Sequence, residues 1–272
     1  MIEGAPSRTA FGAARHRAQH QVIEGGSVFR DPLAVPILGA GDGDLGVEPG
    51  DPRRPLRIFI AMRHRFAEDA LAAAYERGVR QAVVLGAGLD TIAYRNPHED
   101  LRVLEVDHLA TGEWKRERLR EAGIAVPATA RYVGVDFERD DLRTRLVEGG
   151  LDPDAPAFFA WLGVVPYLTR EAITTTLRTV ADLDGEVVLD YPLNAAGDAR
   201  AEALRADLRR RTEAVGEPLL SSFAEGEVPR MLTDLGFTDV EDVGAPDLVP
   251  RYLGVASRGG SRGGGRLVRA RR

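Results

Sequence analysis

The chain of 272 residues has no cysteine, a single lysine and no long apolar run. Without cysteine it can form no disulfide, no thiolate metal site and no cysteine nucleophile, and we expect no metal. No apolar run approaches the roughly 20 residues of a membrane-spanning helix. The first 21 residues, MIEGAPSRTAFGAARHRAQHQ, have no apolar stretch followed by a small-residue cleavage site. We therefore expect a cytoplasmic protein without a membrane partner.

Positive charge is concentrated at one end of the sequence. The chain has 36 Lys and Arg against 42 Asp and Glu, a net charge of −6, and six arginines lie in residues 257–272, which contain no acid. The remainder is acidic, which argues against nucleic acid as a partner of the main body. Residues 258–272 could contact RNA as Arg/Gly-rich segments do. The favoured prediction is a disordered basic tail whose deletion changes little.

The sequence pattern changes at residue 81. Residues 1–80 are predicted to form a helical cap or lid, with helices at 10–24 and 57–77 and a Gly/Asp/Pro-rich loop at 40–53. Short strands rich in Val and Leu then alternate with helices, which is typical of a parallel sheet covered on both faces. These strands are expected at 81–86, 101–106, 131–136, 157–164 and 186–191.

Two further strands are expected close together, at 237–243 and 250–257, and no helix fits between them. They should pair as an antiparallel hairpin. Five parallel strands followed by a hairpin predict an α/β protein with the class I methyltransferase Rossmann-like fold. Its mostly parallel seven-stranded sheet would occupy residues 81–257 as the cofactor-binding domain, with residues 1–80 as N-terminal helical extension. A dinucleotide-binding domain would instead continue with strand–helix–strand units.

A glycine-rich turn follows the first expected strand. Gly86 and Gly88 allow a tight turn and let a ligand approach the backbone. A nicotinamide-binding fingerprint would have a third glycine where Thr91 stands, so NAD is disfavoured. Asp107 comes 19 residues after Gly88, the spacing expected for an acid that binds ribose hydroxyls. We expect Glu105 to point to the other face of its strand.

The third expected strand ends in Asp136 and Phe137. A carboxylate and an aromatic ring at such a strand end suit an adenine, because the carboxylate can accept from the exocyclic amine while the ring stacks. The alternative for Asp136 is a helix cap for the segment near residue 140.

Several segments together resemble one protein family. GAGLDTIAYR at 86–95, LEVDH at 104–108, VDFE at 135–138 and WLGVVPYLT at 161–169 are similar to the leucine carboxyl methyltransferase family. The resemblance is greatest to its bacterial branch of S-adenosylmethionine-dependent methyltransferases. SRTAFGAARHRAQH near the N-terminus and VFRDPLA at 28–34 also resemble that branch.

The resemblance implies S-adenosylmethionine as cofactor and a set of binding residues. Arg63 would bind the cofactor carboxylate in a bidentate fork, with Arg65 as the near alternative. The other implied contacts are Gly86, Gly88, Asp107, Asp136 and Phe137. Many members carry a Glu after the fourth strand, and this chain has Leu162-Gly163-Val164 there, so one polar cofactor contact is missing.

The expected activity is O-methylation of a small-molecule carboxylate or hydroxyl, such as a polyketide-like acid. A hydroxyl acceptor would need a base, for which a histidine is the expected residue. His16 and His20 share a helix face and are expected to be exposed. Residues 7–25 and the helix at 198–214 are expected to enclose the acceptor, and Asp190 and Tyr191 could touch it. No catalytic residue is assigned. The alternatives are a nicotinamide-dependent oxidoreductase and a non-catalytic cofactor- or RNA-binding protein.

Overall fold

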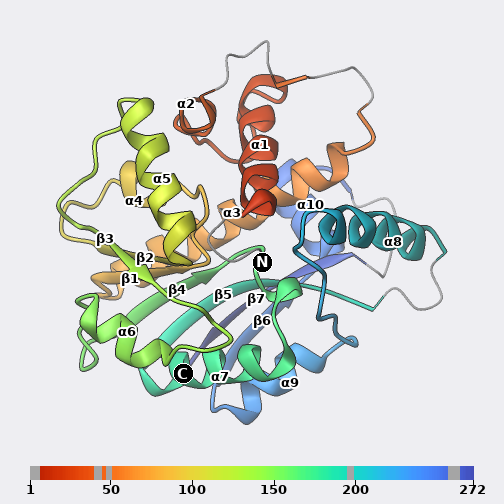
Figure 1. Cartoon of the computed structure of the whole chain (residues 1–272). Helices are drawn as coiled ribbons and strands as arrows, with labels where there is room; N and C mark the ends of the chain where they lie inside the picture. The colour runs from red at the N-terminus through yellow and green to blue at the C-terminus, as the bar shows by residue number, and fades with distance from the viewer. Residues whose placement is uncertain (1–6, 40–44, 47–50, 195–198, 257–263) are drawn as a thin grey trace.

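The computed structural model describes residues 7–39, 45–46, 51–194, 199–256 and 264–272. Within these residues, seven strands form one sheet in the order β3-β2-β1-β4-β5-β7-β6 (Figure 1). β7 runs antiparallel to both of its neighbours, β5 and β6, and the pairings among the first five strands are parallel. The strands are β1 Gln81–Leu85, β2 Arg102–Asp107, β3 Ala130–Gly134, β4 Ala157–Trp161, β5 Gly185–Pro192, β6 Asp239–Val243 and β7 Gly265–Arg271.

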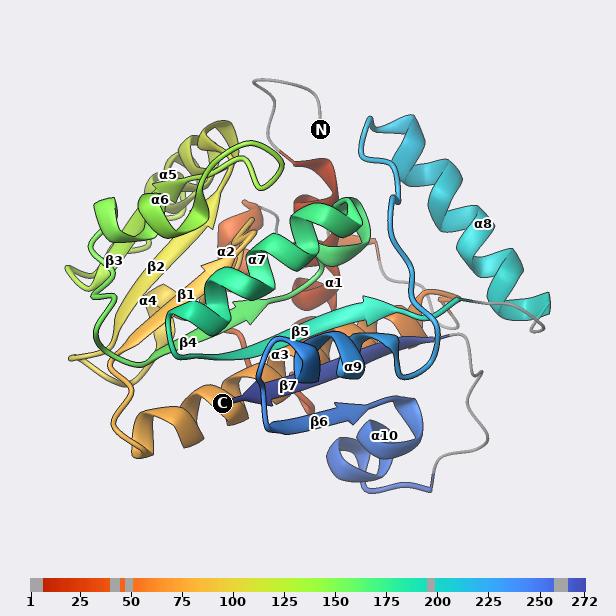
Figure 2. The ribbon, with the colours of Figure 1, turned by 90° about the horizontal axis from the view of Figure 1, so that it is seen from below.

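Helices cover both faces of the sheet (Figure 2). Side chains of α6, α7 and α9 pack in the hydrophobic cluster on one face, and those of α3, α4 and α10 in the cluster on the other. The helices are α1 Arg8–Ile23, α2 Ala34–Leu38, α3 Arg54–Glu76, α4 Ile92–Arg95, α5 Leu109–Glu121, α6 Leu142–Glu148, α7 Arg170–Asp182, α8 Ala199–Ala214, α9 Glu227–Asp234 and α10 Ala245–Leu253, with a 3-10 turn η2 at Val165–Tyr167.

Strand residues alternate between the two clusters, as the pleat requires. In β1, Val83 and Leu85 pack against the α6–α7–α9 face, whereas Ala82 and Val84 pack against the α3–α4–α10 face. All five residues of β1 are buried, because helices lie on both sides. The parallel part of the sheet therefore has the continuous apolar pattern that the sequence predicts, and the class I methyltransferase fold is confirmed.

The end of the chain differs from the prediction. Most of residues 250–257 belong to α10 or follow it, and the last strand, β7, is formed by residues 265–271 inside the expected basic tail. β7 lies between β5 and β6, with Leu267, Val268 and Ala270 fully buried. The expected antiparallel pairing of the last two strands is confirmed, but α10 lies between them and the second strand is not at 250–257. The prediction of a disordered tail over residues 258–272 is wrong for residues 264–272. Residues 257–263 lie outside the described residues.

Charge explains why this arginine-rich segment forms a strand beside β6. The guanidinium of Arg266 is 3.0 Å from the carboxylate of Asp242, and those of Arg269 and Arg271 are 3.2 and 3.0 Å from the carboxylate of Asp239. An acidic strand thus pairs with a basic one across the ladder. Arg266, Arg269 and Arg271 are therefore paired with carboxylates of β6 and are not free cations for RNA contact.

The N-terminal segment forms its own small apolar cluster. Alanines of α1 and residues of α2 pack with Leu45, Leu89 and Leu119, which places this segment against the turn after β1 and against α5. The expected division of the chain at residue 80 stays a prediction. Residues 1–6 and most of the 40–53 loop lie outside the described residues. None of the described helices is long and apolar enough to cross a membrane.

Candidate functional site

A cavity of about 1290 Å³ lies at the carboxyl ends of the parallel strands. This is the edge at which open α/β sheets bind ligands. Its wall includes residues at or just after the ends of β1 to β5, and it also includes parts of α1, α3 and α8. All six residues predicted to bind a cofactor line it: Arg63, Gly86, Gly88, Asp107, Asp136 and Phe137. Ligand pockets commonly occupy roughly 300–1,000 Å³, so the space exceeds that of a single typical ligand.

The turn after β1 requires glycine at two positions. Gly86 and Gly88 have φ angles of 65° and 46°, in the left-handed region that residues with a Cβ rarely adopt. A Cβ on Gly86 would collide with the side chain of Val164, and one on Gly88 would lie 2.8 Å from the Cβ of Ala10. The backbone at this turn is therefore approached closely by α1 and by the segment after β4.

Asp107 and Glu105 share a face of β2 but meet different surroundings. The expectation that Glu105 points to the other face is wrong, because residues two apart on a strand point the same way. Glu105 lies two residues before Asp107 and is buried. Lys115 Nζ lies 2.6 Å from its carboxylate, and the Tyr94 hydroxyl donates a hydrogen bond to it. Asp107 ends the strand, lines the cavity and accepts from the N–H groups of Gly88 (2.7 Å) and His108 (2.8 Å).

The Asp107 carboxylate retains capacity for a ligand. Each of its oxygens accepts one backbone N–H, and an ionised carboxylate has about four acceptor sites in all. Burial raises the pKa of Asp107, which the N–H donors of Gly88 and His108 partly offset. Asp107 thus couples the glycine turn to the end of β2.

Arg63 of α3 enters the cavity wall as a buried cation. Its Nη1 donates to Asp190 Oδ2 over 3.1 Å, and Asp190 Oδ1 accepts from the N–H of Gly163 over 2.5 Å. The Nε of Arg63 is buried and has no hydrogen-bond partner within the described residues. A guanidinium in the cavity wall beside Gly163 is suited to bind a carboxylate. Arg65, the alternative, is exposed, pairs with Asp69 at 2.7 Å and does not line the cavity.

Phe137 and Asp136 lie at the cavity beyond β3. The Phe137 ring is tilted against Trp161, with centroids 6.3 Å apart, and so has a fixed orientation at the wall. Asp136 accepts from the N–H of Glu138 and is 3.7 Å from Arg139. The helix that follows, α6, is capped by Asp141 instead, so Asp136 is not its cap.

A buried ionic network behind the glycine turn joins the segments that carried the family resemblance. Arg17 of α1 donates to Leu89 O at 2.5 Å and pairs with Asp31 at 3.1 Å. Arg95 of α4 is 3.5 Å from Asp31 and pairs with Glu68 of α3. These groups hold α1, the 28–34 segment and α3 against the turn, so the N-terminal helices are part of the wall of the site.

The two N-terminal histidines are not exposed, contrary to the expectation. His20 is 0% exposed and its Nε2 faces the backbone N–H groups of Val28 and Phe29. His16 lines the cavity, and burial lowers its pKa to about 4. Their helix has few large apolar residues, and its sequence therefore indicated an exposed helix. In the structure α2 and α3 cover α1, which packs through small alanines and buried polar groups.

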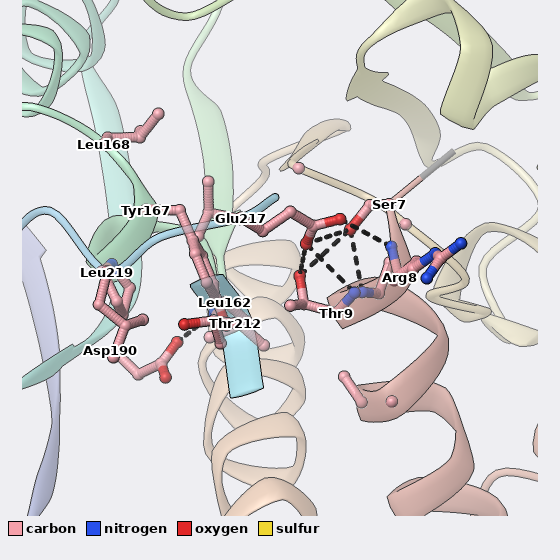
Figure 3. A pocket seen from close by; sticks show the side chains of 18 of the residues that line it. Ser7, Arg8, Thr9, Leu162, Tyr167, Leu168, Asp190, Thr212, Glu217 and Leu219 are labelled. Carbon is pink, nitrogen blue, oxygen red and sulfur yellow. Dashed lines mark hydrogen bonds between the residues drawn. The ribbon is translucent and has the colours of Figure 1, made fainter. Parts of the chain in front are cut away.

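Sequence reasoning missed the residues that close the other side of the cavity. Glu217, after α8, accepts hydrogen bonds from the first turn of α1, and Tyr167 of η2 lies beside them (Figure 3). The inner side of α8 adds Arg205, Leu208 and Thr212. The predicted lid segments 7–25 and 198–214 therefore both contribute to the wall. Glu217 gave no pattern signal, because its partners are more than 200 residues away.

Comparisons with known proteins bear on this geometry. The sequence model of the leucine carboxyl methyltransferase family matches residues 10–181. A Bacillus subtilis protein described as an S-adenosyl-L-methionine-dependent methyltransferase is 31% identical over 63% of this chain and 58% of its own length. Similarly described proteins of Saccharopolyspora erythraea and Mycobacterium ulcerans are 37% and 34% identical, over 65% and 70% of this chain. The chain spans between 58% and 66% of the length of these three relatives.

Solved structures bear on the fold alone. A protein of the DUF574 family from Streptomyces avermitilis superposes with a TM-score of 0.55 at 16% identity, covering 94% of this chain and 96% of its own. Magnesium protoporphyrin IX methyltransferase from Synechocystis, with bound SAH, superposes with a TM-score of 0.51 at 12% identity. The superposition covers 96% of this chain and 99% of that protein. None of these comparisons favours a nicotinamide-dependent oxidoreductase.

Proposed function

The chain belongs to the leucine carboxyl methyltransferase family, and on that premise we propose that it transfers the methyl group of S-adenosylmethionine to an oxygen of a small apolar acid. The observation that carries the proposal is the cavity: about 1290 Å³ at the carboxyl ends of the strands, lined by Asp107 and Arg63 and also by apolar side chains such as Leu208 and Leu220. That volume exceeds the common range for one ligand and leaves room for cofactor and acceptor together.

We assign the cofactor to the wall formed by the ends of β1, β2 and β3. Asp107 would accept from the ribose hydroxyls, Arg63 would hold the carboxylate through its guanidinium group, and Phe137 with Asp136 would contact the adenine. Gly86 and Gly88 have no side chain of their own and form the tight turn at this wall, with Val164 and Ala10 packed close to it. The bound cofactor supplies a methyl sulfonium, and the chain's task is to align the acceptor and exclude water.

The acceptor would lie between the first turn of α1 and the inner side of α8. Leu208 and Leu220 line the cavity and are 40% and 55% exposed, with Val215 beside them. Apolar side chains left open at a cavity are stabilised when an apolar ligand covers them. Arg205, which donates to Leu193 O at 2.6 Å and has no carboxylate partner among the described residues, adds a cation suited to an acid.

A carboxylate acceptor fits the histidines better than a hydroxyl does. A carboxylate is anionic at neutral pH and needs no base, whereas a hydroxyl must lose a proton. His64 is buried, with Nδ1 at 2.7 Å from Ile60 O and Nε2 at 3.4 Å from Asp90. His16, with a pKa of about 4, is a weak base. Neither of these two histidines is suited to take a proton from a hydroxyl near pH 7, and His108, the third histidine in the lining, lies next to Asp107 on the side assigned to the cofactor.

The test is transfer of labelled methyl from S-adenosylmethionine to a panel of apolar carboxylic acids and their phenol or alcohol counterparts. We expect transfer to the acids, with products whose label is released by mild alkali, as from methyl esters. The rate should be flat with pH above the pKa of the acceptor acid. Alkali-stable products and a rate that rises with pH would instead indicate a hydroxyl acceptor. Absence of transfer together with absence of cofactor binding would contradict the proposal.

A further inference from the structure

The Glu217 carboxylate is anchored on the start of α1. It is 7% exposed and accepts from Arg8 N–H at 2.8 Å, Thr9 N–H at 3.2 Å and Ser7 Oγ at 3.2 Å, and also from the hydroxyl of Thr9 (Figure 3). The first N–H groups of a helix have no partner within the helix and carry its positive dipole end. A carboxylate here makes charge-assisted hydrogen bonds, which are stronger than neutral ones.

The first turn of α1 lies over the part of the cavity assigned to the cofactor. Ala10 is so close to the glycine turn that a Cβ on Gly88 would lie 2.8 Å from its own Cβ. The N–H of Ser7 donates to Thr111 Oγ1 of α5 at 3.3 Å, beyond Asp107 in the chain. A ligand that contacts both Asp107 and the Gly86–Gly88 backbone would therefore lie beneath this turn.

Glu217 itself belongs to the acceptor side. Its N–H donates to Thr212 O of α8 at 2.9 Å. The chain then continues to Leu220 and Ser221, whose N–H groups both donate to Pro166 O beside Tyr167. The Glu217 carboxylate thus connects the wall formed by the start of α1 with the wall formed by α8 and the segment after it, which come from distant parts of the sequence. The C-terminal half of α1 has a separate anchor, because Arg17 is held by Leu89 O and Asp31.

We propose that Glu217 is a latch: its hydrogen bonds hold the first turn of α1 closed over the cofactor, and they break when the cofactor enters or leaves. The turn can lift while the Arg17 end of α1 stays attached, since the two anchors are independent. Closure by this turn also completes the wall around the acceptor. The latch rests on the proposed function only for the identity of the ligand beneath it. The hydrogen bonds between Glu217 and the start of α1 do not depend on the proposed function.

Trypsin cleavage of the ligand-free protein tests the tie directly. Arg8 lies in the latched turn and is exposed, so opening of this turn makes the bond after Arg8 available. We expect Glu217→Gln to speed this cleavage on the order of 10-fold or more, as the loss of charge-assisted bonds implies. Glu213→Gln is the matched control, because Glu213 is exposed on α8 and the change removes the same charge. Equal cleavage of both variants would overturn the proposal.

Dissociation of S-adenosylhomocysteine, followed by stopped flow with a displacing excess of S-adenosylmethionine, tests the function of the latch. Glu217→Gln should release it about 10-fold to 100-fold faster than Glu213→Gln does. Thr9→Val removes one donor from the other side of the contact, and it should show a smaller change in the same direction. An unchanged dissociation rate in both Glu217→Gln and Thr9→Val overturns the latch. If the wild-type protein bound no S-adenosylhomocysteine, the proposed function would fail, and the trypsin comparison would still decide whether Glu217 holds α1.

Discussion

At the scale of single residues, two acids on the same face of β2 have different roles: Asp107 lines the cavity, and Glu105, two residues earlier, forms a buried ion pair with Lys115. We expect Asp107→Ala to weaken S-adenosylmethionine binding about 10- to 150-fold, because a hydrogen-bonded carboxylate contributes about 1.5–3 kcal/mol. Asp107→Asn should lose less, since an amide oxygen still accepts. Titration calorimetry measures both, with circular dichroism to verify folding.

Glu105→Gln is the matched control for Asp107. It leaves Lys115 as a buried cation without its carboxylate, so it should lower the free energy of unfolding while cofactor affinity changes little. The result that would contradict this assignment is a loss of affinity in Glu105→Gln and none in Asp107→Ala.

His16 gives a pH prediction. Burial lowers its pKa from 6.5 to about 4, so the unfolded chain takes up a proton there before the folded protein does. Between about pH 6.5 and pH 4 the unfolded chain is protonated at His16 while the folded protein is not, so the free energy of unfolding falls as the pH falls through this window. His16→Gln should flatten the decline of the free energy of unfolding in this window, measured by urea unfolding at several pH values. Identical pH slopes for His16→Gln and wild type would show that His16 is not the group responsible.

At the scale of elements, β7 reverses the expectation for the C-terminus. Truncation after Gly264 should abolish cooperative unfolding, because it removes a strand paired on both sides and the buried Leu267, Val268 and Ala270. The control is Arg271→Gln, which loses a half-exposed ion pair with Asp239 and should cost less than about 1 kcal/mol. Thermal and urea melts compare the two, and a truncated protein that melts like the wild type would refute the assignment of β7.

The inner side of α8 yields a prediction about the acceptor. Leu208→Asp should reduce kcat/KM for apolar acids about 10-fold or more, since it places a charge where an apolar body would lie. Cofactor affinity should stay unchanged. Val147→Asp on α6 is the control, because Val147 is 41% exposed and does not line the cavity. Steady-state kinetics on the acid panel separates them; equal losses in both variants would mean that α8 does not contact the acceptor.

At the scale of the whole molecule, cofactor binding and folding are linked. S-adenosylmethionine or S-adenosylhomocysteine at 100 times its dissociation constant should add about 2.7 kcal/mol to the free energy of unfolding. We expect this as an upward shift of the melting temperature in a thermal shift assay, with no shift from NAD. Stabilisation by NAD alone would contradict both the cofactor and the proposed function.

Local chemistry determined much of this protein from the sequence alone. Most helices and the five parallel strands could be predicted from apolar patterning, because a strand covered on both faces must be apolar throughout. The glycines at 86 and 88 could be predicted as a ligand turn, because few other residues adopt a positive φ. The spacing from Gly88 to Asp107 could be used because neighbouring parallel strands end at one edge.

Only the tertiary structure decided which distant residues meet. The arginines of 265–271 look like a solvated tail until Asp239 and Asp242 of β6 lie beside them, and Glu217 is an ordinary acid until it reaches the start of α1. The burial of His20 and the half-buried position of His16 likewise depend on α2 and α3 folding back over a weakly apolar helix. In each case the deciding energy comes from contacts between separate elements, which no local pattern of residues encodes.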